Sequence, residues 1–389
     1  MDTKDYRIDG ICCAGSYWVA SLKHLDLENI RPYHAVPYYT RTSPSLLGEE
    51  HRREERKHNK IGQQHGQQAA TQVKGSIAFY NDFFKRKTGK SWPEVQEVAK
   101  QFLPYLEKSW PAYLEEIRGL ADGAGVEYET ILALNVRTEI GYGMLNDGCT
   151  AFAWKTKTGS FIAQNWDWEG QQSGNIVVAR IAQEGKPTIH MMTEAGIIGK
   201  IGMNSAGVGV TLNAIAAKGV SFDKLPCHLA LRTALESTSL QEARVKLNKA
   251  GVASACHIQV ADAETGSIGF ENTAFDQAEL QMKDGVNTHS NHLTVSHNGV
   301  EDKGMLKDSP FRLDRVRELL VRLAPGPTID QLKDVLKDDK NSPCAINRSP
   351  TEKSTIRTLF SIVMDLRKRT ASVKMGKPTE GGEELELRP

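Results

Sequence analysis

The chain has 389 residues, and its 49 Lys and Arg against 48 Asp and Glu leave a net charge of +1, which offers no electrostatic footprint for nucleic acid or an anionic membrane. Hydrophobic residues make up 39% and charged residues 25%, as in folded globular proteins, and no apolar run reaches the roughly 18 residues of a membrane span. We therefore expect a folded protein of one large domain or two or three smaller ones, with neither nucleic acid nor membrane as partner.

The cysteines and the two ends of the chain suggest a compartment. Six cysteines are spread without the paired spacing of a zinc site, and the adjacent Cys12 and Cys13 cannot chelate as a CxxC pair does. The first ten residues are acidic where a secretory signal is positively charged, and the last four, Glu386-Leu-Arg-Pro389, are not a peroxisomal tripeptide. We expect a cytoplasmic protein with no signal peptide and no metal.

The N-terminal part of the chain changes character near residue 60. Residues 1–60 have weak periodicity and end in the charged run His51–Lys60, which is typical of a solvated linker, with a nuclear-import or anion-binding patch as the alternative. We expect 1–60 to be an atypical extension. From about Gln68 the apolar spacing is helical, Ser91 and Ser109 each precede Trp-Pro at a helix start, and another helix is expected over Glu127–Glu139. The segment 61–148 is thus predicted to be mainly helical.

From Cys149 onward the apolar period alternates, which predicts strands. The expected strands are Thr150–Lys155, Phe161–Trp166, Ile176–Ile181, His190–Met192, Gly196–Met203, Gly207–Leu212, Ser254–Ala261, Ser267–Glu271, Ala278–Lys283, Thr358–Met364 and Ala371–Met375. The expected helices are Cys227–Glu236, Leu240–Asn248, Phe311–Leu323 and Ile329–Lys337. Strand groups that alternate with helix pairs indicate sheets layered between helices, an α+β architecture.

The pair Gly148-Cys149 stands where the helical segment meets the first strand. Glycine before cysteine leaves its carbonyl open to attack by the thiol. Once that peptide breaks, Cys149 carries a free α-amine with a pKa of about 8, a base for its own thiol. For such a pair taken alone, a buried structural cysteine is the alternative.

Longer blocks around this pair resemble the acyl-coenzyme A:6-aminopenicillanic acid acyltransferase family, also called isopenicillin N acyltransferases or C45 peptidases. The resemblance covers about residues 61–379 and is carried by Asn135–Glu139, Asp147–Thr150, Gln164–Asp167, Thr193–Lys200, Asn204–Gly207, Ala234–Ser237, Ser290–His292 and Thr358–Phe360. It implies a four-layer αββα sandwich of the N-terminal nucleophile hydrolase type. It also implies an inactive precursor, a zymogen, that cuts itself between Gly148 and Cys149. Its products, 1–148 and 149–389, then form a heterodimer in which 149–389 is the catalytic segment.

The resemblance also implies roles for site residues. The nucleophile falls on Cys149, a carboxylate that holds its α-amine on Asp167, and the amide that stabilises the oxyanion on Asn291. A turn cap is the alternative for Asp167 and for Asn291.

Three positions before the last expected hairpin bear on the substrate. Ser354 matches a serine near the family's site, with a solvated loop position as its alternative, and Arg357 is a possible substrate-binding residue. Where the penicillin-forming relatives have arginine this chain has Thr355, so the resemblance does not fix a β-lactam substrate.

The histidines are expected to be structural. His65 stands beside glycine in a helical stretch, where histidine usually packs or caps. His289, His292 and His297 have no acidic or thiol partner at metal-ligand spacing, so we expect loop histidines rather than a metal site.

The expected function is acyl transfer through a thioester at Cys149, from acyl-CoA or an amide to an amine such as 6-aminopenicillanic acid, as in penicillin biosynthesis. Small molecules are the expected partners, and acyl-CoA is a possible co-substrate rather than a cofactor. The alternatives are an amidase or peptidase that hydrolyses small acylated amino compounds, and an uncleaved, non-catalytic relative that binds acyl ligands.

Overall fold

The structure is a computed structural model that describes residues 12–13, 44–141, 148–300, 306–323 and 326–389. Its early helices are α1 (Pro44–Gln68), α2 (Ala70–Thr88), α3 (Trp92–Lys100), α4 (Leu103–Ser109), α5 (Pro111–Ala124), α6 (Tyr128–Asn135) and α7 (Arg137–Ile140). The later helices are α8 (Cys227–Leu235), α9 (Leu240–Ala250), α10 (Ser309–Val321) and α11 (Ile329–Leu336). Within these ranges no helix combines the length and the apolar character that crossing a membrane would take.

The strands form two antiparallel sheets. One has eight strands in the order β1-β4-β5-β6-β7-β8-β9-β10, and the other has six in the order β11-β2-β3-β12-β13-β14. The eight are β1 (Cys12–Cys13), β4 (Ile176–Ile181), β5 (Ile189–Glu194), β6 (Ile201–Asn204), β7 (Val208–Ala214), β8 (Cys256–Asp262), β9 (Gly266–Asn272) and β10 (Gln277–Gln281). The six are β11 (Val286–His289), β2 (Thr150–Lys155), β3 (Ser160–Glu169), β12 (Ile356–Asp365), β13 (Thr370–Met375) and β14 (Glu384–Leu387).

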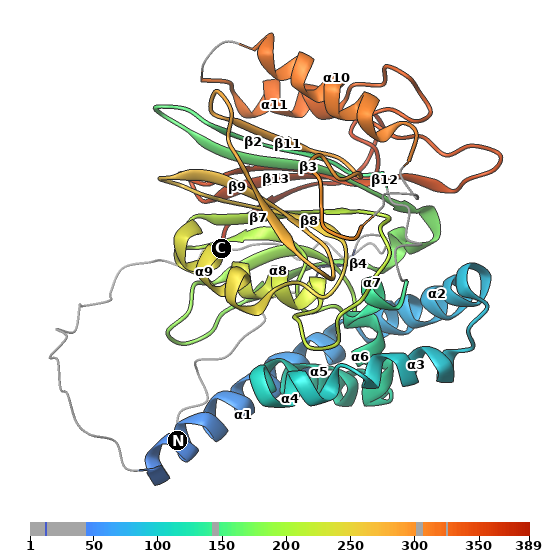
Figure 1. Ribbon diagram of the computed structural model, residues 1–389, viewed down its shortest axis with the longest axis vertical. Coiled ribbons are helices and arrows are strands. Elements are labelled where there is room, and N and C mark those ends of the chain that lie inside the picture. The colour runs from blue at the N-terminus through green and yellow to red at the C-terminus, as the bar shows by residue number, and fades with distance from the viewer. Residues whose placement is uncertain (1–11, 14–43, 142–147, 301–305, 324–325) are drawn as a thin grey trace, which may run out of the picture.

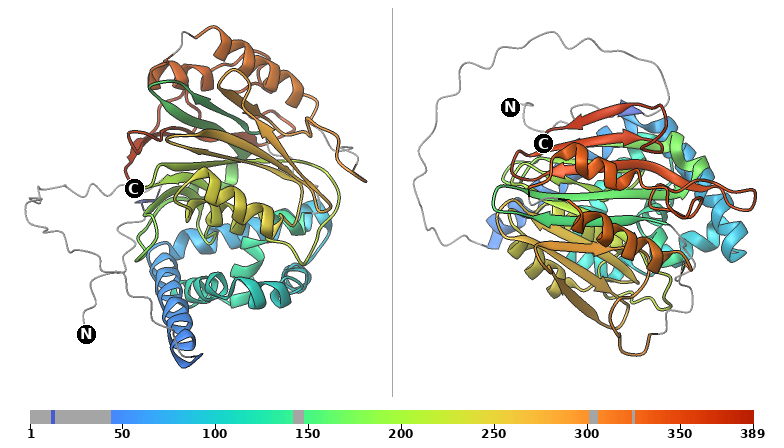
Figure 2. Two further views of the ribbon diagram at one scale, coloured as in Figure 1. Left: turned by 60° about the vertical axis from the view of Figure 1, so that its left-hand side comes forward. Right: turned by 90° about the horizontal axis from the view of Figure 1, so that it is seen from above.

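The sheets stack face to face, with helices on both outer faces (Figure 1). Helices α10 and α11 cover the six-stranded sheet, while α8 and α9 lie on the eight-stranded sheet and the early helices gather beyond the same face (Figure 2). Strand β3 is buried along its whole length because it lies inside its sheet and between two layers. The predicted four-layer αββα sandwich is confirmed.

The charged run His51–Lys60 is part of a helix, so its prediction as a solvated linker is wrong. Helix α1 begins at Pro44, well before the helical pattern expected from Gln68. Its middle turns pack on α5, and His58 is buried there with its Nδ1 2.9 Å from the Glu116 carboxylate. The sequence around His58 does not predict this contact, because the buried partner of His58 lies 58 residues further along the chain.

Most expected strands and helices are confirmed, and the departures have local causes. Gly196–Met203 is not one strand: β6 begins only at Ile201, because Gly196 has a φ of 99° and the Asn135 side chain bonds the backbone of Gly196 and Ile198. The helix expected over Glu127–Glu139 is broken at Val136. Strands β11 and β14, four residues each, were not expected.

Candidate active site

The predicted nucleophile stands directly before β2, at one end of the stacked sheets. Pairing of β2 with β3 sets Thr150 opposite Asn165, which brings Cys149 beside the following residues of β3. The Cys149 thiol is fully buried, with Sγ 4.0 Å from the backbone oxygen of Asp167. Strand pairing therefore joins the predicted nucleophile and the predicted carboxylate.

Asp167 is held by two neighbours from the C-terminal part of the chain. Thr358 lies opposite it in the pairing of β12 with β3 and donates its hydroxyl proton to Asp167 Oδ1 at 2.7 Å. The other oxygen, Oδ2, lies 3.4 Å from Nε of Arg348. These contacts fix the direction of a carboxylate that is fully buried.

Asn291 follows β11 and its amide is oriented from both sides. Its Nδ2 donates to the carbonyl of Ala214 at 3.0 Å, and its Oδ1 accepts from Nη2 of Arg312 at 2.9 Å. Its backbone N–H donates to the Ser309 hydroxyl at 2.7 Å. The Arg312 contact holds Oδ1 in place and thereby fixes the direction of Nδ2, the hydrogen-bond donor of the amide.

Arg312, on α10, links the two ends of the site, and sequence reasoning missed it. Its Nη1 donates to the backbone oxygen of Cys149 at 2.6 Å and to the Thr150 hydroxyl at 3.0 Å, while Nη2 reaches Asn291. Its Nε donates to Asp308 at 2.7 Å. The guanidinium is fully buried, so it makes all of these contacts away from solvent.

Arg348 is a second arginine that the sequence did not reveal. It pairs with Asp308 as well as with Asp167, so Asp308 joins the two guanidinium groups. Burial lowers the pKa of Arg348, but the carboxylates of Asp167 and Asp308 outweigh that effect and raise it. Arg348 also lies against Gly148: a Cβ at Gly148 would come 2.2 Å from its Nε. No local pattern marks either arginine, since each acts on residues far away in the sequence.

Ser354 and Arg357 are placed less centrally. Ser354 lies in a turn bridged to Thr351, and its Oγ accepts from the backbone N–H of Ile356 at 3.4 Å. Arg357 is next to Thr358 in β12, but its guanidinium pairs with Glu380. The structure does not bring Arg357 into the cluster around Cys149.

His65 is buried and accepts from the backbone N–H of Gly196 at 3.3 Å, and burial lowers its pKa to about 4. It packs between helix and sheet, as expected. Two of the later histidines have an acidic partner that does not stand at metal-ligand spacing in the sequence: Glu271 lies 2.8 Å from Nε2 of His289 and 3.2 Å from Nε2 of His297. In the described part of the chain, no cluster of three or more ligating side chains suits a metal ion.

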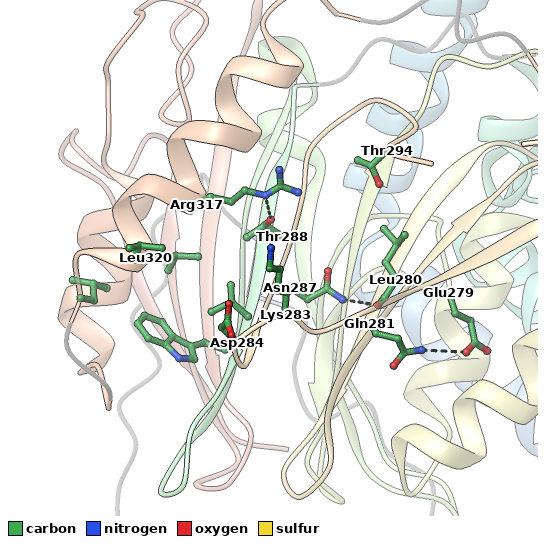
Figure 3. Close-up of a pocket in the computed structure, with 14 residues that line it drawn as sticks. Glu279, Leu280, Gln281, Lys283, Asp284, Asn287, Thr288, Thr294, Arg317 and Leu320 are labelled. Carbon is green, nitrogen blue, oxygen red and sulfur yellow. Dashed lines mark hydrogen bonds between the residues drawn. The ribbon is translucent and has the colours of Figure 1, made fainter. Parts of the chain in front are cut away.

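A cavity of about 770 Å³ lies between α10 and the strands β10 and β11 (Figure 3). Its walls include Trp154, Leu280, Asn287, Arg317 and Leu320. Trp154 is four residues along β2 from Thr150, roughly 13 Å in an extended strand. The lining of the cavity includes none of the six predicted site residues, although Thr288 and Thr294, which precede and follow Asn291 in the sequence, belong to it.

The cluster around Cys149 combines a thiol, a directed carboxylate, an amide donor and two buried cations. A thiol can attack a carbonyl carbon, and fixed donors can stabilise the oxyanion that results. This arrangement suits acyl transfer through a thioester.

Comparisons with known proteins find relatives by sequence and by structure. Residues 154–380 match the family model "Acyl-coenzyme A:6-aminopenicillanic acid acyl-transferase". The chain is 38% identical over 331 residues to the acyl-coenzyme A:6-aminopenicillanic-acid-acyltransferase 40 kDa form of Emericella nidulans, covering 84% of this chain and 92% of that protein. Among solved structures, it is similar to a variant of conjugated bile acid hydrolase from Clostridium perfringens (TM-score 0.46, 16% identity, 62% of this chain and 92% of that one). It is also similar to penicillin V acylase from Agrobacterium tumefaciens (TM-score 0.42, 14% identity, 62% and 86%).

Proposed function

Because this chain belongs to the acyl-coenzyme A:6-aminopenicillanic acid acyltransferase family, we propose that it is an N-terminal cysteine acyltransferase that matures by cutting itself before Cys149. The observation that carries the proposal is the convergence of Cys149, Asp167 and Asn291, which come from distant segments, on one pair of linked arginines. The resemblance gives these three residues their roles, and the geometry supports them.

Maturation is the first step of the proposal. The Cys149 thiol attacks the carbonyl carbon of Gly148, the C–N bond breaks, and the thiol proton passes to the departing nitrogen, which becomes the α-amine of Cys149. Water then hydrolyses the thioester, which releases the Gly148 carboxylate and restores the thiol. In the uncut chain the Cys149 nitrogen belongs to a peptide bond and is no base, so we infer that the precursor is inactive.

The second step is acyl transfer. The free α-amine, held by Asp167, takes the thiol proton while sulfur attacks the acyl carbonyl of an acyl-CoA or an amide. The oxyanion is stabilised by Nδ2 of Asn291, an interaction typically worth about 3 kcal/mol in the transition state. The leaving thiol or amine takes the proton, and an acceptor amine such as 6-aminopenicillanic acid then attacks the thioester and regenerates Cys149.

The two products stay together in this proposal because buried contacts cross the cut. Arg232 bonds Glu116 at 2.7 Å, Arg137 bonds Glu194 at 2.7 Å, and Glu139 accepts from the backbone N–H of Cys227 at 2.9 Å. Separation of the two products would leave these buried charges without partners, which costs several kcal/mol of free energy for each pair. The mature protein should therefore be a heterodimer of its own cleavage products, in a reducing, cytoplasmic setting that suits the free thiols of Cys227 and Cys256.

Hydrolysis is the second candidate, and one position favours it. Thr355 stands where the resemblance expects the arginine of the penicillin-forming relatives, so this chain lacks one cation that a penicillin carboxylate would meet. An amidase or peptidase for small acylated amino compounds would use the same thioester and give it to water.

Intact-mass measurement of the purified protein tests maturation. We expect two chains that separate between Gly148 and Cys149, and a single full-length chain for Cys149→Ala. A cut at the same bond in Cys149→Ala, or an uncut and inactive wild type, would contradict the proposal; the latter would favour a non-catalytic relative. A second measurement distinguishes a transferase from a hydrolase. The acyl-enzyme is formed from acyl-CoA, and the fraction of acyl groups that pass to an added amine is compared with the fraction that pass to water.

A further inference from the structure

The segment that carries Asn291 has no regular secondary structure. It runs from the end of β11 at His289 through residues 290–300, which form neither helix nor strand. An irregular segment needs side-chain contacts to hold one conformation, because it has no ladder of backbone hydrogen bonds. An oxyanion donor, however, must be placed to within about 0.5 Å to be effective.

One buried carboxylate holds this segment on both sides of Asn291. Glu271, on β9 of the other sheet, accepts from Nε2 of His289 at 2.8 Å, two residues before Asn291. It also accepts from the backbone N–H of Thr294 at 2.8 Å, from the Thr294 hydroxyl, and from the backbone N–H of Val295 at 3.3 Å, on the far side. His297 adds a further contact at 3.2 Å.

Every ring nitrogen of the two histidines faces an oxygen atom of the protein. His289 Nδ1 lies 2.8 Å from the carbonyl of Ser290, which can only accept, while its Nε2 faces Glu271. His297 lies between two carboxylates, with Nδ1 2.6 Å from Asp276 and Nε2 facing Glu271. The two histidines thus tie the Asn291 segment to Glu271 and, through His297, to Asp276.

The hydrogen bonds that Glu271 accepts explain why this carboxylate tolerates burial. Burial raises the pKa of Glu271, but hydrogen bonds from His289 and Thr294 and the charge of His289 outweigh this effect and hold the pKa at about 2. The His257 ring stacks on His289 with centroids 3.7 Å apart, and burial, together with the charge of His289, lowers the pKa of His257 well below its usual value. The His257 ring is therefore neutral where it packs on His289.

We propose that Glu271, with His289, His297 and Asp276, forms a clamp that positions the Asn291 amide for the oxyanion. Glu271 is then a positioning residue: it touches neither Cys149 nor the reacting atoms, and acts through the segment that it closes around Asn291. This inference rests on the proposed function, which makes Asn291 the oxyanion donor.

The test compares four variants of the matured protein: Glu271→Gln, Asn291→Ala, their double mutant and Asp262→Asn. Asp262→Asn is the matched control, because Asp262 is another buried carboxylate that bonds backbone N–H groups, at Leu240 and Thr265, away from the Asn291 segment. The measurements are the rate of acyl-enzyme formation per titrated thiol and hydrogen exchange of residues 289–298.

We expect Glu271→Gln to slow acyl-enzyme formation by about 10- to 100-fold with KM unchanged, the loss typical of a displaced catalytic group. Hydrogen exchange should rise in 289–298 and not in the control. The double mutant should be no slower than Asn291→Ala, because the clamp acts only through that side chain. If Glu271→Gln does not fold, Asp276→Asn, which loosens only the His297 side, should show a smaller loss in the same direction.

The possible outcomes distinguish a failure of this inference from a failure of the proposed function. A normal rate in Asn291→Ala would refute the oxyanion role in the proposed function, and the positioning role would fall with it. A slow Asn291→Ala beside a normal Glu271→Gln, an additive double mutant, or unchanged exchange in 289–298 would overturn the clamp alone.

Discussion

At the scale of single residues, the candidate site is a closed set of charges. Two guanidinium ions, Arg312 and Arg348, face two carboxylates, Asp167 and Asp308, so the buried cluster has no net charge. Buried ions are tolerated when each has a partner, and breaking one such pair typically costs about 3–5 kcal/mol. The cluster therefore holds both sides of the Gly148–Cys149 peptide bond rigidly.

Gly148 is explained by this cluster rather than only by its small size at a carbonyl. A methyl group there would meet the Arg348 guanidinium, which is tied to Asp167 and Asp308 and cannot move aside freely. We predict that Gly148→Ala folds but is cut at least about tenfold more slowly, since overpacking costs about 1–3 kcal/mol. A time course of chain cleavage after refolding measures this.

The control for that prediction is Gly381→Ala, because a Cβ at Gly381 meets no atom within 4 Å. It should be cut at the rate of the unaltered protein. Cleavage of Gly148→Ala at that same rate would show that Arg348 gives way without affecting the reaction.

At the scale of elements, the contact between α1 and α5 depends on glycines. Each helix has two glycines four residues apart, Gly62 and Gly66 on α1, Gly119 and Gly123 on α5. A Cβ at Gly62 would come 1.9 Å from the backbone oxygen of Glu116, and one at Gly119 would come 1.9 Å from that of Asn59. The two backbones therefore touch directly, which only glycine permits.

We predict that Gly119→Ala lowers the free energy of unfolding by about 1–3 kcal/mol, or more, because two backbones must separate. Urea unfolding of the uncut Cys149→Ala chain measures it. Gly174→Ala is the matched control, since its Cβ would meet open space, and it should stay within about 0.5 kcal/mol. Equal stability of the two variants would show that the two helices can move apart without a measurable loss of stability.

At the scale of the whole molecule, three neutral histidines are buried between the layers. Burial lowers the pKa of His65 to about 4, and lowers the pKa of His228 and of His257 well below the usual value. On Glu236 burial has the opposite effect and raises the pKa, but the charges of Arg232 and Lys186 outweigh burial and hold the pKa of Glu236 at about 2.

Both effects make the fold less stable in acid. A histidine whose pKa is lower in the folded state leaves the unfolded state to bind the proton first, so stability falls as pH drops below about 6.5. A carboxylate with a lowered pKa contributes stability above about 4.5 that is lost as the pH falls towards 2. We predict that the free energy of unfolding falls from pH 7.5 to 5, by up to about 1.4 kcal/mol per pH unit for each histidine.

Urea unfolding of the Cys149→Ala chain at several pH values measures this slope, because that variant remains one chain. His65→Gln removes one buried histidine and should flatten the slope between pH 6.5 and 4. An identical slope in both chains would mean that His65 does not titrate on unfolding.

The layered α+β class, most strands and helices of the second half, and the family could all be predicted from the sequence. These follow from short-range patterns: an alternating period at Thr150–Lys155, a capping serine before α9, and motif blocks that include Gly148-Cys149. The residues matched to Cys149, Asp167 and Asn291 also came from local blocks, and their roles stay a prediction. Strand boundaries were accurate at Thr150–Lys155 and Ile176–Ile181, whereas β3 extends three residues beyond the expected end at Trp166.

The remaining features became visible only in the folded chain, because they depend on partners that are remote in the sequence. Arg312 and Arg348 are ordinary basic residues until folding brings them to Cys149 and Asp167, 163 and 181 residues away. The charged run within α1 is predicted to be a linker until α5 supplies its buried face, and Glu271 shows no sign of holding Asn291 until two sheets stack. A buried charge leaves no mark in its own neighbourhood, since what allows its burial is the opposite charge that the fold sets against it.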